Sequence, residues 1–236
     1  MVLRGVVMRR YSIVLAGVLG LAAWFAPLSW TDDRKAAEPR PIPVAAPLPV
    51  DSLTLAAECL DRGDDAGAVP HLKEHVRAHP DALVLRLHLA EVLRKIGRTD
   101  EARSQFERFV SDAQTADGPA ATKLVHAHTR LMELADDEYG EHLHRGIGLV
   151  LLVRKWTADP ERRDAVASEQ TLAKAAKALK VAIELCPRDP RANLYLAEAF
   201  EGLGQPSAAR TAIRTARAGM PDAAVTDAER ERLGGR

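Results

Sequence analysis

The sequence predicts an all-α fold, a right-handed α-solenoid of antiparallel helix pairs, and three observations support this prediction. Residues 55–109 contain one pattern twice at a spacing of 34 residues, which is typical of a helix-turn-helix repeat. Leu and Ala dominate the chain, and this composition favours helix over strand. Gly and Pro are expected at the ends of the periodic stretches and not inside them, where they would interrupt a helix.

The two copies of the pattern match residue by residue. The matched pairs are Leu55–Leu89, Ala56–Ala90, Gly63–Gly97, Ala68–Ala102, Leu72–Phe106 and His75–Phe109. This arrangement resembles the tetratricopeptide repeat (TPR), in which a small residue lies midway along the first helix, a glycine closes it and an alanine opens the second. The resemblance implies a TPR-like solenoid that acts as a scaffold for protein–protein interaction.

The N-terminal region has the pattern of a membrane anchor. Residues 1–10 contain three arginines, and residues 11–30 then contain no charged side chain. Twenty helical residues span roughly 30 Å, the thickness of the bilayer hydrocarbon. The positive-inside rule places residues 1–10 in the cytoplasm. We therefore expect a single-pass protein of the cell inner membrane with its C-terminal domain outside the cytoplasm, in the periplasm if the source is bacterial.

A cleaved signal peptide is the alternative interpretation of residues 11–30. Cleavage requires small residues at the −3 and −1 positions. The segment before Pro27 places Trp24 where a small residue is needed, so an uncleaved anchor fits better. Residues 31–50 follow as a linker with five prolines. Proline favours an extended polyproline conformation, and this linker would reach roughly 40 Å.

The helical repeat domain is predicted at residues 51–221, with an irregular part at 114–168. The spacing from Gly97 to Gly204 equals three periods plus five residues, so the repeat resumes after an interruption. One repeat lacks its first helix, whose place is taken by an unusually long helix over 138–156. The expected segments are helix pairs at 51–62 with 65–78, 82–96 with 99–112, 120–135 with 138–156, a loop at 157–168, a helix at 169–186, and a last pair at 191–203 with 206–219.

Residues 222–236 are predicted to be a polar C-terminal cap or tail. Thr226 and Glu229 have the spacing of a capping box, in which each side chain accepts from the other residue's backbone N–H. We expect them to open a short polar helix that covers the last apolar face of the solenoid.

Composition excludes some functions. The chain has 33 basic and 33 acidic side chains, whereas nucleic-acid binding needs surplus Lys and Arg. Phosphate-binding loops, zinc-hydrolase helices and nucleophile elbows are absent from the sequence. We therefore expect protein partners, no nucleic acid, no cofactor and no enzymatic activity, with self-association as a further possibility.

A polar cluster interrupts the regular pattern between residues 126 and 148. On two successive helices, its side chains form two stripes that a hairpin would bring together. This region suggests an alternative function, a histidine-lined metal or small-ligand site with a catalytic role, although a satisfied polar network between helices is the simpler interpretation. The candidate residues are His126, His128, Arg130, Glu133, Glu141, His144 and Arg145.

The TPR resemblance also implies a binding surface. In TPR arrays the first helix of each pair lines a concave wall that holds an extended peptide or a partner helix. Transferred to this sequence, that wall includes Leu87, Glu91, Arg94, Leu194 and Glu198. We therefore predict a membrane-tethered TPR domain that presents a concave groove to a protein partner.

Overall fold

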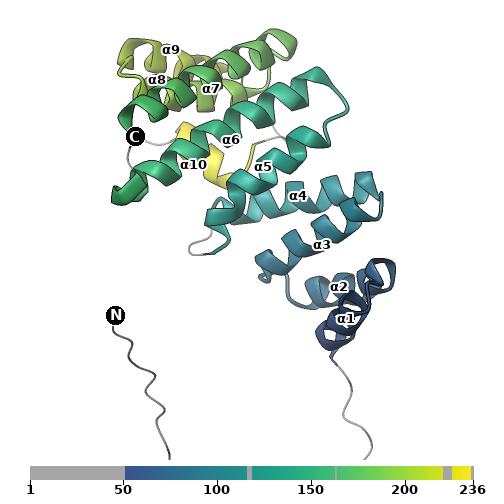
Figure 1. Cartoon of the computed structure of the whole chain (residues 1–236). Coiled ribbons are helices and arrows are strands. Elements are labelled where there is room, and N and C mark those ends of the chain that lie inside the picture. Colours follow the sequence, from purple (N-terminus) through teal and green to yellow (C-terminus); the bar gives the residue numbers. More distant parts are fainter. Residues whose placement is uncertain (1–50, 116–118, 163, 220–224, 235–236) are drawn as a thin grey trace, which may run out of the picture. The chain divides into compact units, whose positions relative to one another are not determined.

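The computed structural model describes four stretches of the chain: residues 51–115, 119–162, 164–219 and 225–234 (Figure 1). These residues form ten α-helices and two short 3-10 turns. The predicted membrane anchor at 11–30 and the linker at 31–50 lie outside the described residues. Within the described stretches, no helix is both long and apolar enough to cross a bilayer.

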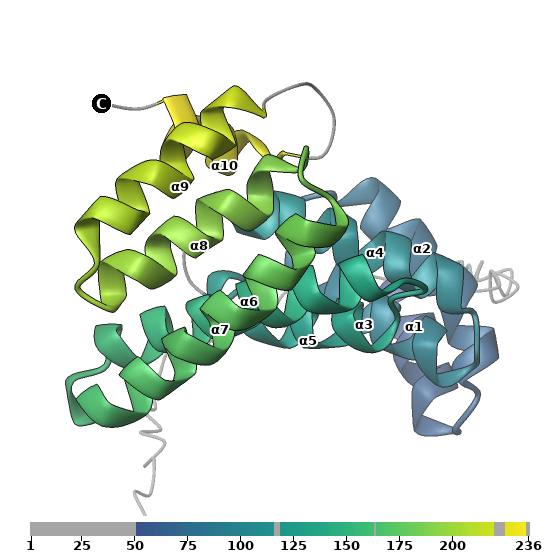
Figure 2. The ribbon, with the colours of Figure 1, turned by 90° about the horizontal axis from the view of Figure 1, so that it is seen from above.

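Consecutive helices contact each other as antiparallel pairs, which confirms the predicted all-α, TPR-like fold (Figures 1 and 2). The first four helices lie within about two residues of their predicted positions. They are α1 (Ser52–Asp61), α2 (Asp65–Ala78), α3 (Leu83–Lys95) and α4 (Thr99–Ala113). The last hairpin, α8 (Pro190–Gly202) with α9 (Pro206–Ala218), also matches its prediction closely.

Three glycines make the turns of the regular hairpins. Gly63, Gly97 and Gly204 have φ values of 75°, 79° and 69°, in the left-handed region that side chains with a Cβ disfavour. In each turn the residue after the glycine donates its N–H to a carbonyl in the last turn of the helix, at 2.8 to 2.9 Å. This is the Schellman C-cap. Glycine recurs at this phase because this turn requires it.

The middle of the chain departs from the prediction. The helix expected at 120–135 is shorter, because the 3-10 turn η1 (Ala121–Lys123) precedes α5 (Leu124–Glu133). The prediction of a loop at 157–168 was wrong for half of these residues, which are helical. Helix α6 (Glu138–Ala158) extends into it, and α7 (Ala165–Leu185) begins four residues earlier than predicted.

The early start of α7 has a local cause. The Asp164 side chain accepts a hydrogen bond from the N–H of Ala167 at 2.9 Å, so it caps the helix. Ala165 and Ala167 are strong helix formers, and together with the cap they outweigh the polarity of the segment. Only residues 159–164, including the 3-10 turn η2 (Pro160–Arg162), separate the two helices.

Proline and glycine also occur inside helices, contrary to the expectation that they mark only helix ends. Pro70 lies within α2, and Gly146 lies within α6. A Cβ atom on Gly146 would come within 2.4 Å of Leu179 Cγ on α7. The glycine therefore permits α6 and α7 to approach closely. Helix α6 contacts α5, α7 and α8.

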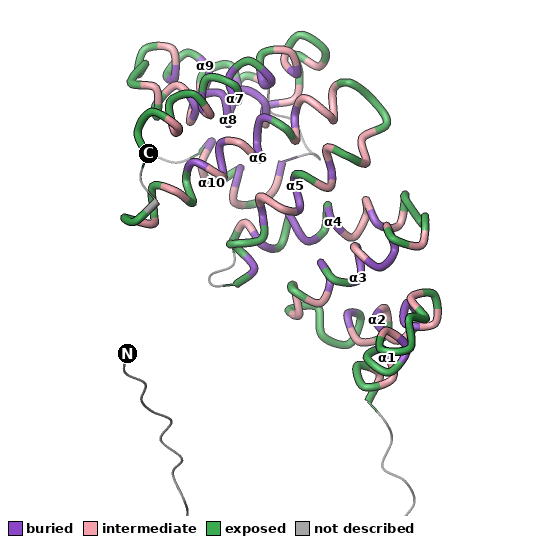
Figure 3. Tube along the Cα trace, in the orientation of Figure 1, coloured by how far each residue is buried: buried purple, intermediate pink, exposed green. Residues whose placement is uncertain are grey.

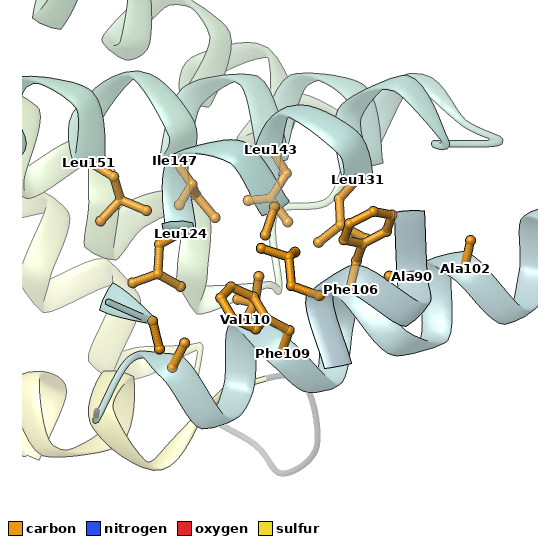
Figure 4. Packing of buried hydrophobic residues seen from close by; sticks show 14 of the residues in the cluster. Ala90, Ala102, Phe106, Phe109, Val110, Leu124, Leu131, Leu143, Ile147 and Leu151 are labelled. Carbon is orange, nitrogen blue, oxygen red and sulfur yellow. The ribbon is translucent and has the colours of Figure 1, made fainter. Parts of the chain in front are cut away.

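A continuous apolar core runs through helices α1 to α8, and the inward side of each helix is buried (Figure 3). In its centre, Phe106 and Phe109 of α4 pack among Leu131 of α5 and Leu143 of α6 (Figure 4). A smaller core joins α8 and α9 to the last helix, α10 (Asp227–Gly234). Its buried members are Leu194, Ala216, Val225 and Leu233.

Candidate functional site

A cavity of about 490 Å³ lies between α4, α5, α6, α8 and α10. Its lining combines apolar side chains from the core with polar groups from all five helices. The polar lining residues are Arg103, Glu107, Ser111, Gln114, His128, Asp136, Asp137, Tyr139, His144, Arg191, Thr226 and Glu229. Its size is within the range of pockets that bind small molecules.

Two histidines meet on one wall of the cavity. The Nδ1 atoms of His128 (α5) and His144 (α6) are 3.1 Å apart, so one of them donates and the other accepts. Burial lowers the pKa of His128 well below its ordinary value, and burial lowers the pKa of His144 to about 4. The positive charge of Arg191 acts on both pKa values in the same direction. At neutral pH the two rings therefore form an uncharged, hydrogen-bonded pair.

An ion pair at the start of α8 forms another wall. The Asp189 carboxylate accepts hydrogen bonds from Arg191 Nη2 at 2.6 Å, from the Arg191 backbone N–H at 2.8 Å, and from the Tyr139 hydroxyl of α6. Burial alone would raise the pKa of Asp189, but the Arg191 hydrogen bonds hold it below its ordinary value. Burial, reinforced by Asp189, raises the pKa of Tyr139. These contacts fix α6 against α8.

Helix α10 closes the cavity through Gln114 at the end of α4. The Gln114 amide donates to Glu229 Oε1 at 3.3 Å and to the Tyr195 hydroxyl at 3.4 Å, and its Oε1 accepts from Thr226 Oγ1 at 2.6 Å. Thr226 and Glu229 form the predicted capping box, with bonds of 2.9 and 3.2 Å. One side chain thus connects α4 to both α8 and α10.

The predicted polar cluster at 126–148 does not form one site. His126 and Arg130 both contact Glu91 of α3, at 2.6 and 2.8 Å, and Arg130 also contacts Glu133 at 2.7 Å. His128 belongs instead to the buried pair with His144. The remaining two residues, Glu141 and Arg145, pair with each other on α6 at 2.6 Å. A satisfied polar network was the simpler interpretation of the two stripes, and one charged pocket was the alternative. In the structure their side chains pair in separate groups.

The geometry gives little support to a metal centre. Among the described residues, no three His, Cys, Asp or Glu side chains lie close enough together to hold a metal ion. Glu91 contacts Arg94, His126 and Arg130. Burial alone would raise its pKa, but the hydrogen bonds from Arg94 and Arg130 hold that pKa below its ordinary value. The guanidinium groups of Arg94 and Arg130 and the His126 ring therefore surround this carboxylate.

The predicted groove residues separate into two environments. On α3, Leu87 is buried, whereas Arg94 is partly exposed and pairs with Glu91 at 2.9 Å. On α8, Leu194 packs against Val225 and Leu233 of the smaller core, and Glu198 pairs with Arg154 and Arg232. The structure therefore places the chain's own helix α10 over the α8 part of the predicted groove.

The sequence did not single out two side chains that organise this region. They are Gln114, which lines the cavity, and Asp189, which pairs with the lining residue Arg191. The capping box formed by Thr226 and Glu229 was the local sequence signal for a helix at the C-terminus. No local pattern indicated that this helix contacts Gln114, since Gln114 and Glu229 are 115 positions apart in the sequence.

Residues 85–114 match the family model described as tetratricopeptide repeat, and this stretch covers nearly all of α3 and α4. The α3–α4 hairpin is thus similar to a tetratricopeptide repeat. The predicted resemblance is confirmed for this hairpin. TPR domains are generally scaffolds for protein–protein interaction and are typically non-enzymatic.

Two solved structures are similar to the chain, and their titles are "Crystal structure of MamA protein" and "Crystal structure of MamA". Each is 20% identical to it. The first has a TM-score of 0.35 and covers 71% of this chain and 89% of its own. The second has a TM-score of 0.34 and covers 73% of this chain and 96% of its own. No curated protein matches the chain.

Proposed function

We propose that this chain is a non-enzymatic scaffold that is tethered to a membrane and binds a peptide or helix of a protein partner. Residues 11–30 would anchor it, residues 31–50 would hold the repeat domain away from the bilayer, and the domain would lie outside the cytoplasm. The TPR hairpin at 85–114 and the antiparallel helix pairs around it support the scaffold role.

One observation supports a helix as the bound element. The repeat phase assigns Leu194 and Glu198 to the binding wall, and α10 lies against these two residues. Leu233 of α10 is in the same apolar cluster as Leu194, and Arg232 pairs with Glu198. The wall therefore already offers the mixture of apolar surface and charge that holds a short helix.

The α3 part of the wall is the second contact surface in this proposal. Arg94 and Glu91 have side-chain exposures of 36% and 24%, so a partner can reach both. Glu91 pairs with Arg94 and Arg130 and contacts His126, and these contacts keep the side chains at fixed positions on this surface. Because this surface is polar and lacks aromatic anchors, we expect a transient partner.

Photocrosslinking in the membrane tests the proposal. A photoreactive residue replacing Arg94 should crosslink to a protein partner in intact membranes. The matched control replaces Lys177, an exposed residue of α7 that the repeat phase assigns to the second helix of a pair. Equal crosslinking at both positions, or none at Arg94, would contradict the scaffold proposal.

The cavity of about 490 Å³ favours a second candidate, the binding of a small polar molecule near His144 and Arg191. Native mass spectrometry of the full chain released from detergent would detect a retained ligand. If the cavity binds such a molecule, the chain should show an added mass. Gln114→Leu should abolish this added mass, because it removes three polar contacts at the cavity wall. A chain of unmodified mass that also gains nothing on incubation with cell metabolites would exclude this candidate.

A further inference from the structure

Helix α10 occupies a defined surface, which we call the α10-binding face. It combines side chains from three helices, and α10 contacts it through both apolar and polar groups. The face consists of Gln114 of α4, Leu194, Tyr195 and Glu198 of α8, and Ile213 and Ala216 of α9.

We infer that the α10-binding face is an exchangeable docking surface and that its partner is a helix with the pattern Ser/Thr-x-x-Glu-x-x-Arg-Leu. This inference rests on the proposed scaffold function and specifies its partner. The pattern is that of α10, in which Thr226, Glu229, Arg232 and Leu233 make the contacts.

Each position of the pattern has a chemical reason. The Thr226 hydroxyl and the Glu229 carboxylate both bond Gln114, so a partner needs a hydroxyl and a carboxylate three residues apart. The Arg232 guanidinium pairs with Glu198 and lies over the Tyr195 ring, 4.8 Å from its centroid. The side chain of Leu233 is 1% exposed and fills the apolar space beside Leu194 and Ala216. Aspartate or glycine at the leucine position would leave that space unfilled.

The attachment of α10 is weak enough for exchange. The helix has eight residues, and a helix of this length is not stable by itself in water. Two large apolar side chains, Val225 and Leu233, provide its buried apolar contacts. Glu229 is 1% exposed, and its carboxylate accepts hydrogen bonds from the Gln114 amide and the Thr226 backbone N–H, while the positive charge of Arg191 also acts on it. Removing this carboxylate from water costs solvation energy, which opposes docking.

Because α10 is covalently linked to the rest of the chain, a partner must compete with it for the α10-binding face. Five residues, 220–224, separate the last residue described after α9 from Val225, and this short connection gives α10 an effective concentration of roughly millimolar. A partner that carries the same pattern and additional contacts along α3 could displace α10. A partner without those contacts would have to be present at a comparable concentration.

Binding of a peptide to the full chain tests the inference. The probe is a fluorescein-labelled peptide of residues 225–234, measured by fluorescence anisotropy against the full chain in detergent. Leu233→Asp should release α10, because a buried aspartate has no partner there, and the peptide should then bind about tenfold more tightly than to the unmodified chain. Leu185→Asp is the matched control, since Leu185 is 46% exposed on α7, and it should leave peptide binding unchanged.

Any one of the following results would overturn the inference. The peptide could bind both variants equally. The same peptide with aspartate at its leucine position could bind as well as the original. Light scattering could also show that Leu233→Asp or the unmodified chain binds α10 of a second copy.

Hydrogen exchange of the unmodified chain provides a second measurement that needs no variant. Saturating peptide should increase exchange in 225–234 and leave α8 protected, and no increase there would contradict displacement. Crosslinking at Arg94 without peptide binding would reject this inference and leave the scaffold proposal standing.

Discussion

The α3–α4 hairpin and the α6–α7 hairpin both consist of two antiparallel helices. They differ in helix length, in how closely the helices approach and in which polar side chains they bury. In α3–α4, helices of 13 and 15 residues enclose phenylalanines. Of their charged groups, Glu91 is partly exposed, whereas Arg86 is buried and pairs with Asp112 of α4. In α6–α7, two helices of 21 residues approach closely at Gly146. The longer α6 partly buries Tyr139 and His144 against neighbouring helices. The departure from the 34-residue period is therefore where the histidine pair and the Tyr139–Asp189 contact form, and where much of the cavity lining lies.

The buried ion pair of the irregular region should give the largest effect on stability. Asp189→Ala leaves Arg191 without its carboxylate and removes the cap of α8, so we expect a loss of about 3–5 kcal/mol in the free energy of unfolding. Asp137→Ala is the control, because Asp137 also caps a helix, through Gly140 N–H at 2.7 Å, but is exposed. Its loss should be about 1 kcal/mol. Urea denaturation of the full chain in detergent measures both, and equal losses would show that the ion pair contributes little.

The histidine pair should make the irregular region sensitive to acid. Burial lowers the pKa of His144 to about 4 from an ordinary value of 6.5, so the unfolded chain binds more protons between these two values. Stability should therefore fall as the pH is lowered through this window, and His144 alone should contribute a loss of about 2 kcal/mol between pH 7 and pH 5. Denaturation at both pH values measures this loss.

A variant separates His144 from other sources of acid sensitivity. His144→Gln keeps a hydrogen-bonding partner for His128 and removes one titrating ring, so the pH dependence should become smaller. His88→Gln is the control because His88 is exposed on α3. If both variants keep the original pH dependence, the buried pair is not its source.

The two glycines of α6 provide a matched test of close helix packing. Gly146→Ala would place a Cβ atom 2.4 Å from Leu179 Cγ, and we expect a net loss of about 1–2 kcal/mol from overpacking. Gly148→Ala would place a Cβ atom at an ordinary 3.5 Å from His128 Cβ. It should be neutral or stabilising by up to about 1 kcal/mol, because alanine favours helix. Similar losses at both positions would contradict the close approach of α6 and α7.

The smallest predicted effect concerns the turn of the regular hairpin. Gly97 has φ of 79° and open space around its Cα, so Gly97→Ala adds backbone strain without a clash. We expect a loss of about 1 kcal/mol. Gly97→Asn should lose less, because asparagine tolerates this conformation better. Thermal denaturation of the unmodified chain, Gly97→Ala and Gly97→Asn gives their order of stability. A stabilising effect of Gly97→Ala would exclude strain at this turn.

Local patterns in the sequence were sufficient for the regular hairpins and for the capping box. The turn glycines, such as Gly97, and the pair Thr226 and Glu229 act on neighbours within a few residues, so their spacing is informative. The start of α7 was missed because the Asp164 cap and following alanines outweigh the polarity of that segment. The cavity was not predicted because it depends on contacts between residues far apart in the sequence, such as Gln114 and Glu229. A periodic sequence pattern does not indicate such contacts.

Hydrogen exchange of the full chain shows directly whether α10 is a weakly held helix on a stable binding wall. Amides of 225–234 should exchange by local opening, much faster than amides of α8 around Leu194 and Glu198. The α3–α4 hairpin should be protected like α8. If α10 instead exchanges as slowly as α8, it is an integral part of the fold and the wall it covers is not available to a partner.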